Sequence, residues 1–467
     1  MTDLAYLTIS EASALLRDRK LSPVEYTEAL LKRADAHDGL LNVYIRRMDD
    51  VALDAARRAE AEIARGEWKG PMHGIPFGLK DIVDVEGVPT TAHSKILADN
   101  VAKSDAEVTR RLREAGGVLT GKLATHEFAL GGPSFDLPWP PARNPWNRDH
   151  HPGGSSSGSG AGVAAGFFPA AIGTDTGGSV RNPASCNGIV GMKATYGRVS
   201  RAGVIPLAFS LDHVGPMTRT VEDNAIMLNV IAGHDPADPG SARAEKPDFT
   251  AGLEKGVKGL RIGIIRHFYT RDLEADPEMA QAIEDAASLL AREGAEIREV
   301  KVAPLQDFAT CNRIILMSEA YAIHEKWLQE RPQDYGALCR ERIAAGAFYR
   351  AVDYIKALRW RGVLVRQFNE AMADLDVVIT ASSMEPPAPI EHAEEVERTY
   401  PRQARAPFNL TGSPAMAVPT GFSSAGMPLS MQIVGKPFDE AMVYRVGRAY
   451  ERATDWTSRH PTLASAA

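Results

Sequence analysis

Cysteine is scarce in this chain of 467 residues, which argues against a disulfide framework and against a cysteine-based zinc site. The sequence has three cysteines, Cys186, Cys311 and Cys339, which are far apart and form no CxxC pair. A disulfide framework needs paired cysteines and a structural zinc site needs clustered ones, so the sequence predicts neither. We therefore expect no metal centre, and the composition fits a reducing compartment.

Long apolar runs and blocks of positive charge are absent as well. The longest weakly polar stretch, residues 161–172, is too short and too rich in glycine to span a bilayer, which needs about 20 apolar residues. The N-terminus has no basic region followed by an apolar stretch, so no signal peptide is expected. The net charge is −7 and no Lys/Arg-rich run is present, which argues against nucleic-acid binding. We expect a cytoplasmic protein that binds neither nucleic acid nor membrane.

Patterns typical of strands and helices alternate along most of the chain. Hydrophobic residues make up 44% and charged residues 24% of the sequence, which is the balance of a globular protein. The patterns predict strands at 74–79, 116–122, 169–174, 260–265, 375–380, 415–419 and 429–434, and helices at 104–116, 161–166, 277–293 and 439–453. No internal repeat or low-complexity linker divides the chain. The sequence therefore predicts a single large α/β domain over residues 1–467.

Two parts of this domain are predicted to be mainly helical. Residues 1–70 form an N-terminal helical part, with helices across 8–66, because Thr8 or Ser10 and the pair Ser22-Pro23 are typical helix starts. Residues 303–372 are rich in aromatics and helix formers. We expect them to form a variable, cap-like segment over the sheet.

Residues 153–160 are an unbroken run of glycine and serine. Such a run is ordinarily a flexible linker between exposed elements. Here it leads into the apolar, small-residue segment 161–166, which suits a buried helix packed closely against a sheet. The run ends a long loop over residues 131–160 that is rich in Gly, Pro and Ser. Because a long loop inside a compact chain is usually functional or disordered, this context favours a functional loop.

A second glycine-rich stretch covers residues 173–181 and contains Gly177-Gly178-Ser179. Glycines directly before a serine let backbone N–H groups point at a small anion. Such a nest can bind a phosphate or stabilise the oxyanion of a tetrahedral intermediate. The stretch alone leaves both interpretations open.

Lys80 ends the predicted strand at 74–79, in which Ile75, Phe77 and Leu79 alternate with small residues. Most lysines are exposed surface charges. A lysine at the end of an apolar strand is a candidate for partial burial, which lowers its pKa and lets it act as a base.

Three other motifs are weaker. Residues 154–158 match the G-x-S-x-G nucleophile elbow, but residues 143–152 before them predict no strand, and the elbow needs one. Residues 116–122 resemble a phosphate-binding P-loop, but Leu123 stands where Ser or Thr would bind Mg²⁺. The adjacent His150-His151 lacks the i, i+4 spacing of a zinc helix.

Three motifs together resemble the amidase signature family: Gly78-Leu79-Lys80-Asp81, Gly153-Gly154-Ser155-Ser156 and Asp175-Thr176-Gly177-Gly178-Ser179-Val180-Arg181. Their order and spacing are similar to those of family members. The match is dense over 71–235, which would be the catalytic core, and resumes at 409–419 and 432–435. The resemblance implies an α/β/α fold with a mixed central sheet covered by helices on both faces.

The resemblance also implies a hydrolase that cleaves carboxylic amides through an acyl-enzyme on Ser179. Ser155, preceded by a cis peptide bond, would relay the proton of Ser179 to neutral Lys80. The oxyanion would be held by four backbone N–H groups, those of Thr176, Gly177, Gly178 and Ser179. Aryl esters and carbamates are further compatible substrates. No cofactor is expected, and the protein would be a monomer or homodimer.

Substrate contacts are expected from Gly131, Gly132, Phe135 and Ser156. The apolar loop 133–141 either packs onto the domain or forms a mouth for aryl and alkyl groups, and the sequence leaves both open. The other wall would come from side chains of the cap-like segment, with Phe308, Met317, Tyr321 and Trp327 as candidates.

A stand-alone amidase acting on small amides is the favoured function. The alternative is the A subunit of a glutamine-dependent tRNA amidotransferase, which would feed ammonia to a partner. Residues 131–136 do not resemble the Ser/Thr/Glu/Asn-rich loop of that amidotransferase component. A third hypothesis, a binding protein with an inactive site, conflicts with the intact set of Lys80, Ser155 and Ser179.

Overall fold

A computed structural model describes residues 3–463, so the first two and the last four residues of the predicted unit 1–467 lie outside the described part. Within residues 3–463, eleven strands form one sheet in the order β1-β3-β2-β4-β6-β5-β10-β11-β9-β7-β8. β2 is parallel to β3 and β4, and β7 is parallel to β8 and β9, whereas the other neighbours are antiparallel. The strands are β1 (Tyr44–Arg47), β2 (Pro76–Lys80), β3 (Val118–Leu123), β4 (Ala170–Asp175), β5 (Val190–Lys193), β6 (His213–Thr218), β7 (Arg261–Ile264), β8 (Glu296–Glu299), β9 (Val377–Ala381), β10 (Ala415–Phe422) and β11 (Pro428–Gly435).

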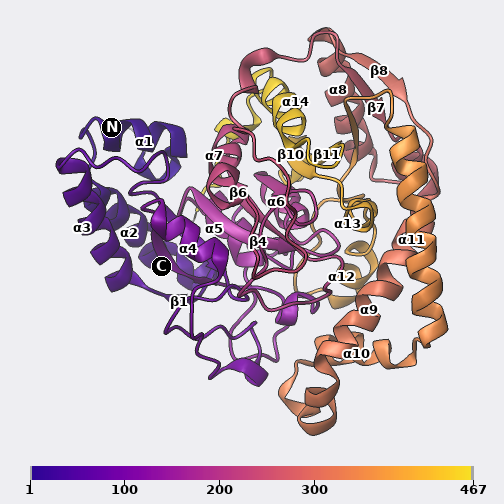
Figure 1. Cartoon of the computed structure of the whole chain (residues 1–467), viewed down its shortest axis with the longest axis horizontal. Coiled ribbons are helices and arrows are strands. Elements are labelled where there is room, and N and C mark those ends of the chain that lie inside the picture. Colours follow the sequence, from indigo (N-terminus) through magenta and orange to yellow (C-terminus); the bar gives the residue numbers. More distant parts are fainter. Residues whose placement is uncertain (1–2, 464–467) are drawn as a thin grey trace.

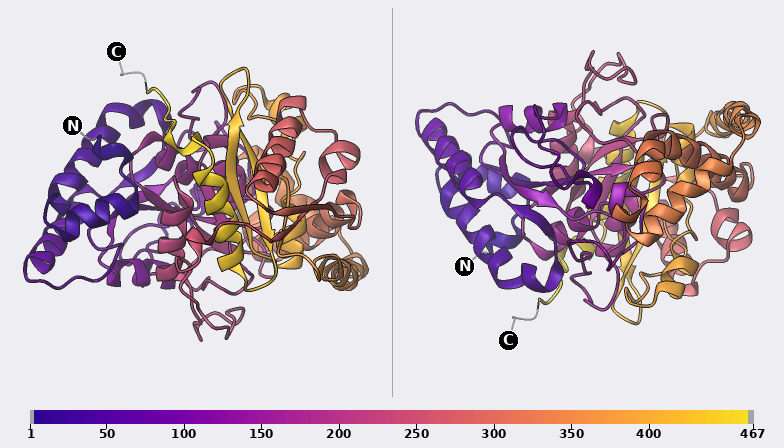
Figure 2. Two further views of the ribbon diagram at one scale, coloured as in Figure 1. Left: turned by 90° about the horizontal axis from the view of Figure 1, so that it is seen from above. Right: turned by 90° about the horizontal axis from the view of Figure 1, so that it is seen from below.

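Helices surround this sheet, with α1 to α3 at one end of the molecule and α9 to α11 at the other (Figures 1 and 2). The α-helices are α1 (Ile9–Arg17), α2 (Pro23–Leu41), α3 (Asp49–Ala64), α4 (Glu107–Glu114), α5 (Ser157–Ala165), α6 (Arg181–Asn187), α7 (Val221–Ile231), α8 (Pro277–Arg292), α9 (Leu305–Glu330), α10 (Ala337–Ala344), α11 (Ala351–Ala371), α12 (Ala393–Thr399), α13 (Ala406–Thr411) and α14 (Glu440–Arg452). In the part of the chain that the structure describes, no helix is both long and apolar enough to cross a membrane.

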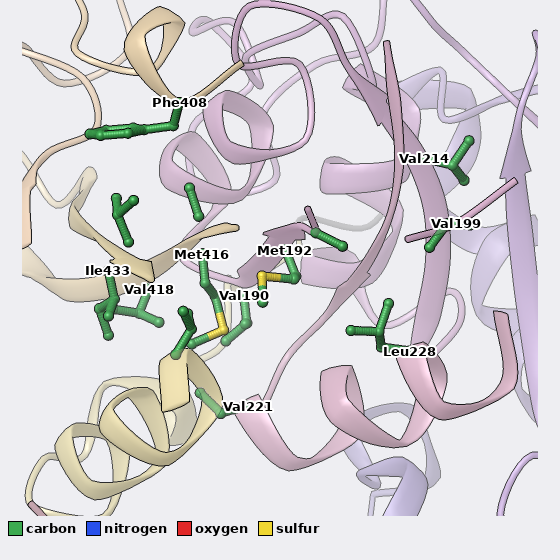
Figure 3. Close-up of a cluster of buried hydrophobic side chains, with 14 of the residues drawn as sticks. Val190, Met192, Val199, Val214, Val221, Leu228, Phe408, Met416, Val418 and Ile433 are labelled. Carbon is green, nitrogen blue, oxygen red and sulfur yellow. The ribbon is translucent and has the colours of Figure 1, made fainter. Parts of the chain in front are cut away.

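Successive residues of the central strands belong to different cores, because side chains alternate between the two faces of a sheet. Met416 of β10 lies in the core shared with α7 and α14, where Val221 and Met192 are its neighbours in the picture (Figure 3). Ala417, the next residue, lies in a second core with Val163 of α5 and α6 residues. Helices therefore cover both faces, and the predicted α/β fold with a mixed central sheet is confirmed.

The N-terminal helices begin at the residues that the sequence indicates. Thr8 caps α1 in a capping box with Glu11, and Ser22 caps α2 ahead of Pro23. The prediction of helices across 8–66 is wrong at Tyr44–Arg47, which forms β1 and pairs with β3 at the edge of the sheet. Pairing with a neighbouring strand decides this short segment, because β-propensity depends on its surroundings.

Three further strands lie where the sequence patterns predicted none. β5 and β6 contain glycine within them, and β6 also contains Pro216, so their alternation is weak. β8 is short, charged and at the edge of the sheet. Strands β5 and β6 lie between β4 and β10 and so connect the two halves of the sheet.

Candidate active site

Lys80 is the last residue of β2, and its side chain is fully buried. Its Nζ donates hydrogen bonds to the hydroxyls of Ser155, at 2.7 Å, and of Thr174, at 2.8 Å. Thr174 lies on β4, which pairs with β2 in parallel, so the sheet itself fixes one of the two hydroxyls beside the amine. Thr174 belongs to the glycine-rich stretch 173–181, but its contact with Lys80 is a feature that the sequence patterns did not predict.

Burial lowers the pKa of Lys80 to about 7, because the charged ammonium loses its hydration there. The carboxylates of Asp212 and Asp175 oppose this shift from a distance. Two neutral hydroxyls are its hydrogen-bond partners, and no carboxylate of residues 3–463 forms an ion pair with it. At neutral pH a large fraction of Lys80 is therefore the free amine, which can accept a proton.

Ser155 lies in the turn that leads into α5, and the Gly154–Ser155 peptide bond is cis, as the family resemblance implied. A Cβ on Gly154 would lie 2.0 Å from the ring of His126, so only glycine fits at this position. The Gly154 N–H donates to the side-chain oxygen of Asn182 at 2.9 Å. The first half of the glycine-serine run is thus a packed, hydrogen-bonded turn with a buried Ser155, and residues 157–160 begin α5.

The loop around Ser179 is organised by one buried carboxylate. Asp175, at the end of β4, accepts hydrogen bonds from the backbone N–H groups of Gly178, at 2.8 Å, and Val180, at 3.2 Å. The guanidinium of Arg181 pairs with Asp175 through both Nε, at 3.0 Å, and Nη2, at 2.9 Å. The charge of Arg181 and its hydrogen bonds hold the pKa of Asp175 well below its usual range despite burial.

Ser179 lies next to the Lys80–Ser155 pair. The Ser156 N–H donates to the Ser179 carbonyl oxygen at 3.2 Å, which holds the two serine-containing segments side by side. Ser179 is half-buried, and its hydroxyl makes no hydrogen bond to another residue of the described chain. It lines a cleft, so this hydroxyl is open to an incoming molecule.

Of the four N–H groups predicted to hold an oxyanion, one is already engaged. The Gly178 N–H donates to Asp175, which removes it from the free donors. The N–H groups of Gly177 and Ser179 have no acceptor within residues 3–463, and both residues line the cleft together with Thr176. The structure therefore leaves Thr176, Gly177 and Ser179 as the free part of the predicted set.

The cleft has a volume of about 560 Å³, and its walls come from four parts of the chain. The glycine loop 176–179 forms one wall, and residues 129–130 lie beside it. Helices α9 and α10 supply a further wall, and residues 397–406 close the remaining side. The cap-like segment therefore contributes directly to the site.

Four residues predicted to contact substrate lie outside the lining of this cleft. Ser156 is fully buried and bonds to the backbone of Thr174, so it supports the turn. Phe135 is 56% exposed, because its loop lies on the surface. Gly131 and Gly132 are also outside the lining, which includes their neighbours Ala129 and Leu130 instead. The structure therefore does not bring the four predicted contacts to the cleft.

Of the four predicted wall residues of the cap-like segment, one lines the cleft and three do not. Met317 lines the cleft. Phe308 is buried in the main core, and Trp327 stacks near Phe128, so these aromatics pack the segment against the domain. Tyr321 is not among the lining residues either. The unforeseen lining residues include Arg313, Arg342 and Arg405, which no motif marks.

The weaker motifs find structural explanations. Lys122, the lysine of the P-loop-like stretch, is fully buried and forms an ion pair with Asp81 at 2.7 Å. No strand precedes Ser155 directly, so the elbow geometry is absent from this part of the described chain. No cluster of three His, Cys, Asp or Glu residues within residues 3–463 has the arrangement of a metal site.

Comparison with known proteins identifies the family. A family model for amidases matches residues 25–444. This chain belongs to the amidase family. It is 40% identical to the A subunit of the glutamyl-tRNA(Gln) amidotransferase of Chloroflexus aggregans, and the match covers 100% of both chains.

Solved structures of amidase relatives share the whole fold. The native peptide amidase of Stenotrophomonas maltophilia superposes with a TM-score of 0.87 at 30% identity, covering 98% of this chain and 99% of that one. A structure described as a vestigial protein complex that reveals the origins of an s-triazine catabolic enzyme superposes with a TM-score of 0.90 at 31% identity, covering 98% of this chain and 100% of that one. The amidase family thus includes relatives with different described activities, and membership alone selects none of them.

Proposed function

We propose that this amidase hydrolyses a carboxylic amide through an acyl-enzyme on Ser179, with Ser155 and Lys80 as the proton relay. The observation that carries the proposal is the 2.7 Å hydrogen bond between the fully buried Lys80 and Ser155, directly beside the Ser179 loop. A lysine with a pKa of about 7 is matched to a base that works near neutral pH.

In the first half of the reaction, Ser179 Oγ attacks the carbonyl carbon. Its proton passes to Ser155 Oγ as Ser155 gives its own proton to the Lys80 amine. When the tetrahedral intermediate collapses, the carbon–nitrogen bond breaks and the relay returns this proton to the leaving amine. In the second half, water attacks the acyl-enzyme, the same relay removes a proton from the water, and Ser179 regains it as the acid leaves.

The negative charge of each tetrahedral intermediate falls on the former carbonyl oxygen. The free N–H groups of Gly177 and Ser179, with Thr176 beside them, are the donors proposed to stabilise it. The Asp175–Arg181 pair fixes these donors before substrate arrives, so they need no reorganisation during the reaction. These steps require only proton and acyl transfer, so aryl esters and carbamates are compatible with the same site.

The test compares hydrolysis of anilides, aliphatic amides, carbamates and p-nitrophenyl esters by the wild type and by Ser179→Ala. The variant is expected to lose turnover of every substrate that the wild type cleaves. Because the Ser179 hydroxyl makes no hydrogen bond within the described chain, its removal leaves the fold intact, which circular dichroism checks. Near wild-type turnover by Ser179→Ala would overturn the mechanism.

The second candidate function is the A subunit of a glutamine-dependent tRNA amidotransferase. Full-length identity of 40% to a protein that carries this description supports it. The loop 131–136 favours the stand-alone enzyme. Co-purification of partner chains together with ammonia release from glutamine would favour the amidotransferase, whereas cleavage of small amides by the isolated chain favours the stand-alone amidase.

A further inference from the structure

Arg405 is a buried cation without a counter-ion among the residues that the structure describes. It directly precedes α13, its exposed fraction is 2%, and no carboxylate within residues 3–463 forms an ion pair with it. Buried charges are ordinarily paired, because removing an ion from water is costly unless a partner compensates. An arginine left in this state beside a cleft is therefore a sign of a missing anionic partner.

The hydrogen bonds of Arg405 occupy only one corner of its guanidinium. Nη1 donates to the carbonyl oxygen of Ser382 at 2.9 Å and to the hydroxyl of Ser383 at 2.7 Å. Nε is buried without an acceptor, and Nη2 donates to no residue of the described chain. Nη2 is not among the buried atoms, so it is the donor left for an anion, and a guanidinium N–H bound to a carboxylate forms a charge-assisted hydrogen bond.

Arg181, which is also buried beside the Ser179 loop, shows how a structural arginine is satisfied here. Its Nε and Nη2 both pair with Asp175, and its remaining donors reach Gln432 and Asn409. Asp175 is therefore already committed to another cation and to the loop backbone. In Arg405, by contrast, neither Nε nor Nη2 donates to a carboxylate of the described chain.

The position of Arg405 places its buried Nε against the nucleophile loop. A Cβ on Gly178 would lie 2.4 Å from Arg405 Nε, so only glycine lets the guanidinium pack against the loop, one residue before Ser179. Gly178 also has a φ of 129°, which other residues rarely adopt. Arg405 lines the same cleft as Ser179.

The titratable neighbours of Arg405 do not neutralise it. Burial raises the pKa of Tyr400 to about 12 and that of Cys186 to about 12, so both are uncharged at neutral pH. Burial lowers the pKa of Arg405 to about 10, which still leaves it charged. The cleft also holds Arg313 and Arg342 against Glu341 and Glu397, so its lining side chains carry an excess of positive charge.

We infer that the Arg405 guanidinium, through its unpartnered Nη2, binds a carboxylate of the substrate, so that this enzyme acts on amides that carry a carboxylate group. The inference rests on the proposed amide hydrolysis for its catalytic consequence, but the binding step stands by itself. The carboxylate belongs either to the acyl part or to the amine part of the substrate. Arg405 would then be a specificity-determining residue that positions the amide at Ser179.

Matched substrates distinguish the two sources. For the acyl side, the monoanilides of succinic and glutaric acid are compared with anilides in which a carboxamide replaces the carboxylate. For the amine side, 4-acetamidobenzoate is compared with 4-acetamidobenzamide. The release of the aromatic amine is measured in every case. The wild type is expected to prefer the charged member of at least one pair by about 10- to 100-fold in kcat/KM, the range of a charged hydrogen-bonded pair.

Arg405→Gln is expected to reduce that preference to about onefold. The ratio is the readout, because damage to the Ser179 loop would lower both rates together. Arg405→Lys keeps the charge but loses the guanidinium, so it should retain part of the preference. Arg402→Gln is the matched control, since Arg402 pairs with Glu385 outside the cleft, and its ratio should equal that of the wild type.

A binding measurement separates this inference from the proposed function. Calorimetric titration of Ser179→Ala with succinic monoanilide and with 4-acetamidobenzoate needs no turnover, and adding Arg405→Gln should weaken the tighter of the two at least tenfold. Equal kcat/KM for charged and neutral substrates in the wild type would overturn the inference and leave amide hydrolysis standing. An unchanged dissociation constant in the double variant would overturn it as well. If the wild type cleaves none of these substrates while Ser179→Ala still binds one of them in an Arg405-dependent way, the result counts against the proposed function alone.

Discussion

Lys80 and Lys122 lie on adjacent parallel strands, and both side chains are fully buried. In the β2–β3 register Leu79 is opposite Lys122, so the two lysines point to opposite faces of the sheet. Lys122 pairs with the carboxylate of Asp81, whereas Lys80 is bonded to two hydroxyls. The comparison teaches that the partner, and not burial alone, decides whether an interior lysine is a structural cation or a base.

The largest expected effect separates the two lysines by activity. Lys80→Ala should lower kcat/KM by at least about a thousandfold, because a nucleophile and its proton relay act as one unit. Steady-state hydrolysis of the substrate that the wild type cleaves best measures this loss, with Lys80→Met as a control for the lost packing volume. Activity within tenfold of the wild type in both variants would remove Lys80 from the mechanism.

The next effect separates them by stability. Lys122→Met leaves the buried carboxylate of Asp81 without its cation, which should cost about 3–5 kcal/mol in the free energy of unfolding. Urea unfolding followed by circular dichroism measures the cost, and the activity of the folded fraction should stay close to that of the wild type. A variant as stable as the wild type would show that the ion pair is not what holds Lys122 in the interior.

The pH dependence of the rate should follow Lys80. The pKa of Lys80 is about 7, and the reaction needs the free amine, so the rate falls as pH drops below 7 and the amine becomes charged. One ionisation gives about a tenfold loss per pH unit on this limb and a plateau at alkaline pH. Profiles of kcat/KM between pH 5 and 9 measure it. A maximum in acid would contradict a lysine base.

The smallest effect comes from Thr174→Val, which removes one hydroxyl from Lys80 and keeps the side-chain volume. The hydroxyl accepts a hydrogen bond from the ammonium and so favours its charged form. Its loss should lower the pKa of Lys80 further and move the rising limb of the pH profile to lower pH, with a loss of rate of about tenfold or less at the plateau. A limb that moves to higher pH would mean that Thr174 acts in another way.

The sequence predicts much of what lies near Lys80, because short motifs encode local backbone geometry. The predicted positions are close to the observed ones for strands β2, β3 and β4 and for helix α5. These elements bring Lys80 together with Ser155 and with Thr174, the second hydroxyl that Lys80 contacts. Gly154 and Gly178 are motif glycines at which a Cβ would meet a neighbouring side chain, so these two serve a close approach.

The cleft is different, because its walls come from segments that are far apart in the chain. Arg405 and α9 reach Ser179 only through the tertiary fold, and no local pattern marks them. Phe135 shows the opposite case: an aromatic in a loop near the motifs suggested a substrate contact, but this side chain faces solvent. Strand β6 was missed for a local reason, since Pro216 interrupts its pattern.

The most direct test of the central claim is the site and rate of labelling by a serine-directed sulfonyl fluoride. After labelling, peptide mass spectrometry locates the adduct, and the rate is compared between the wild type and Lys80→Ala. We predict a single adduct on Ser179 in the wild type and labelling slowed at least a hundredfold in Lys80→Ala, since the relay activates the nucleophile. An adduct on another residue, or equal labelling rates in the two proteins, would contradict the assignment of Ser179 and Lys80.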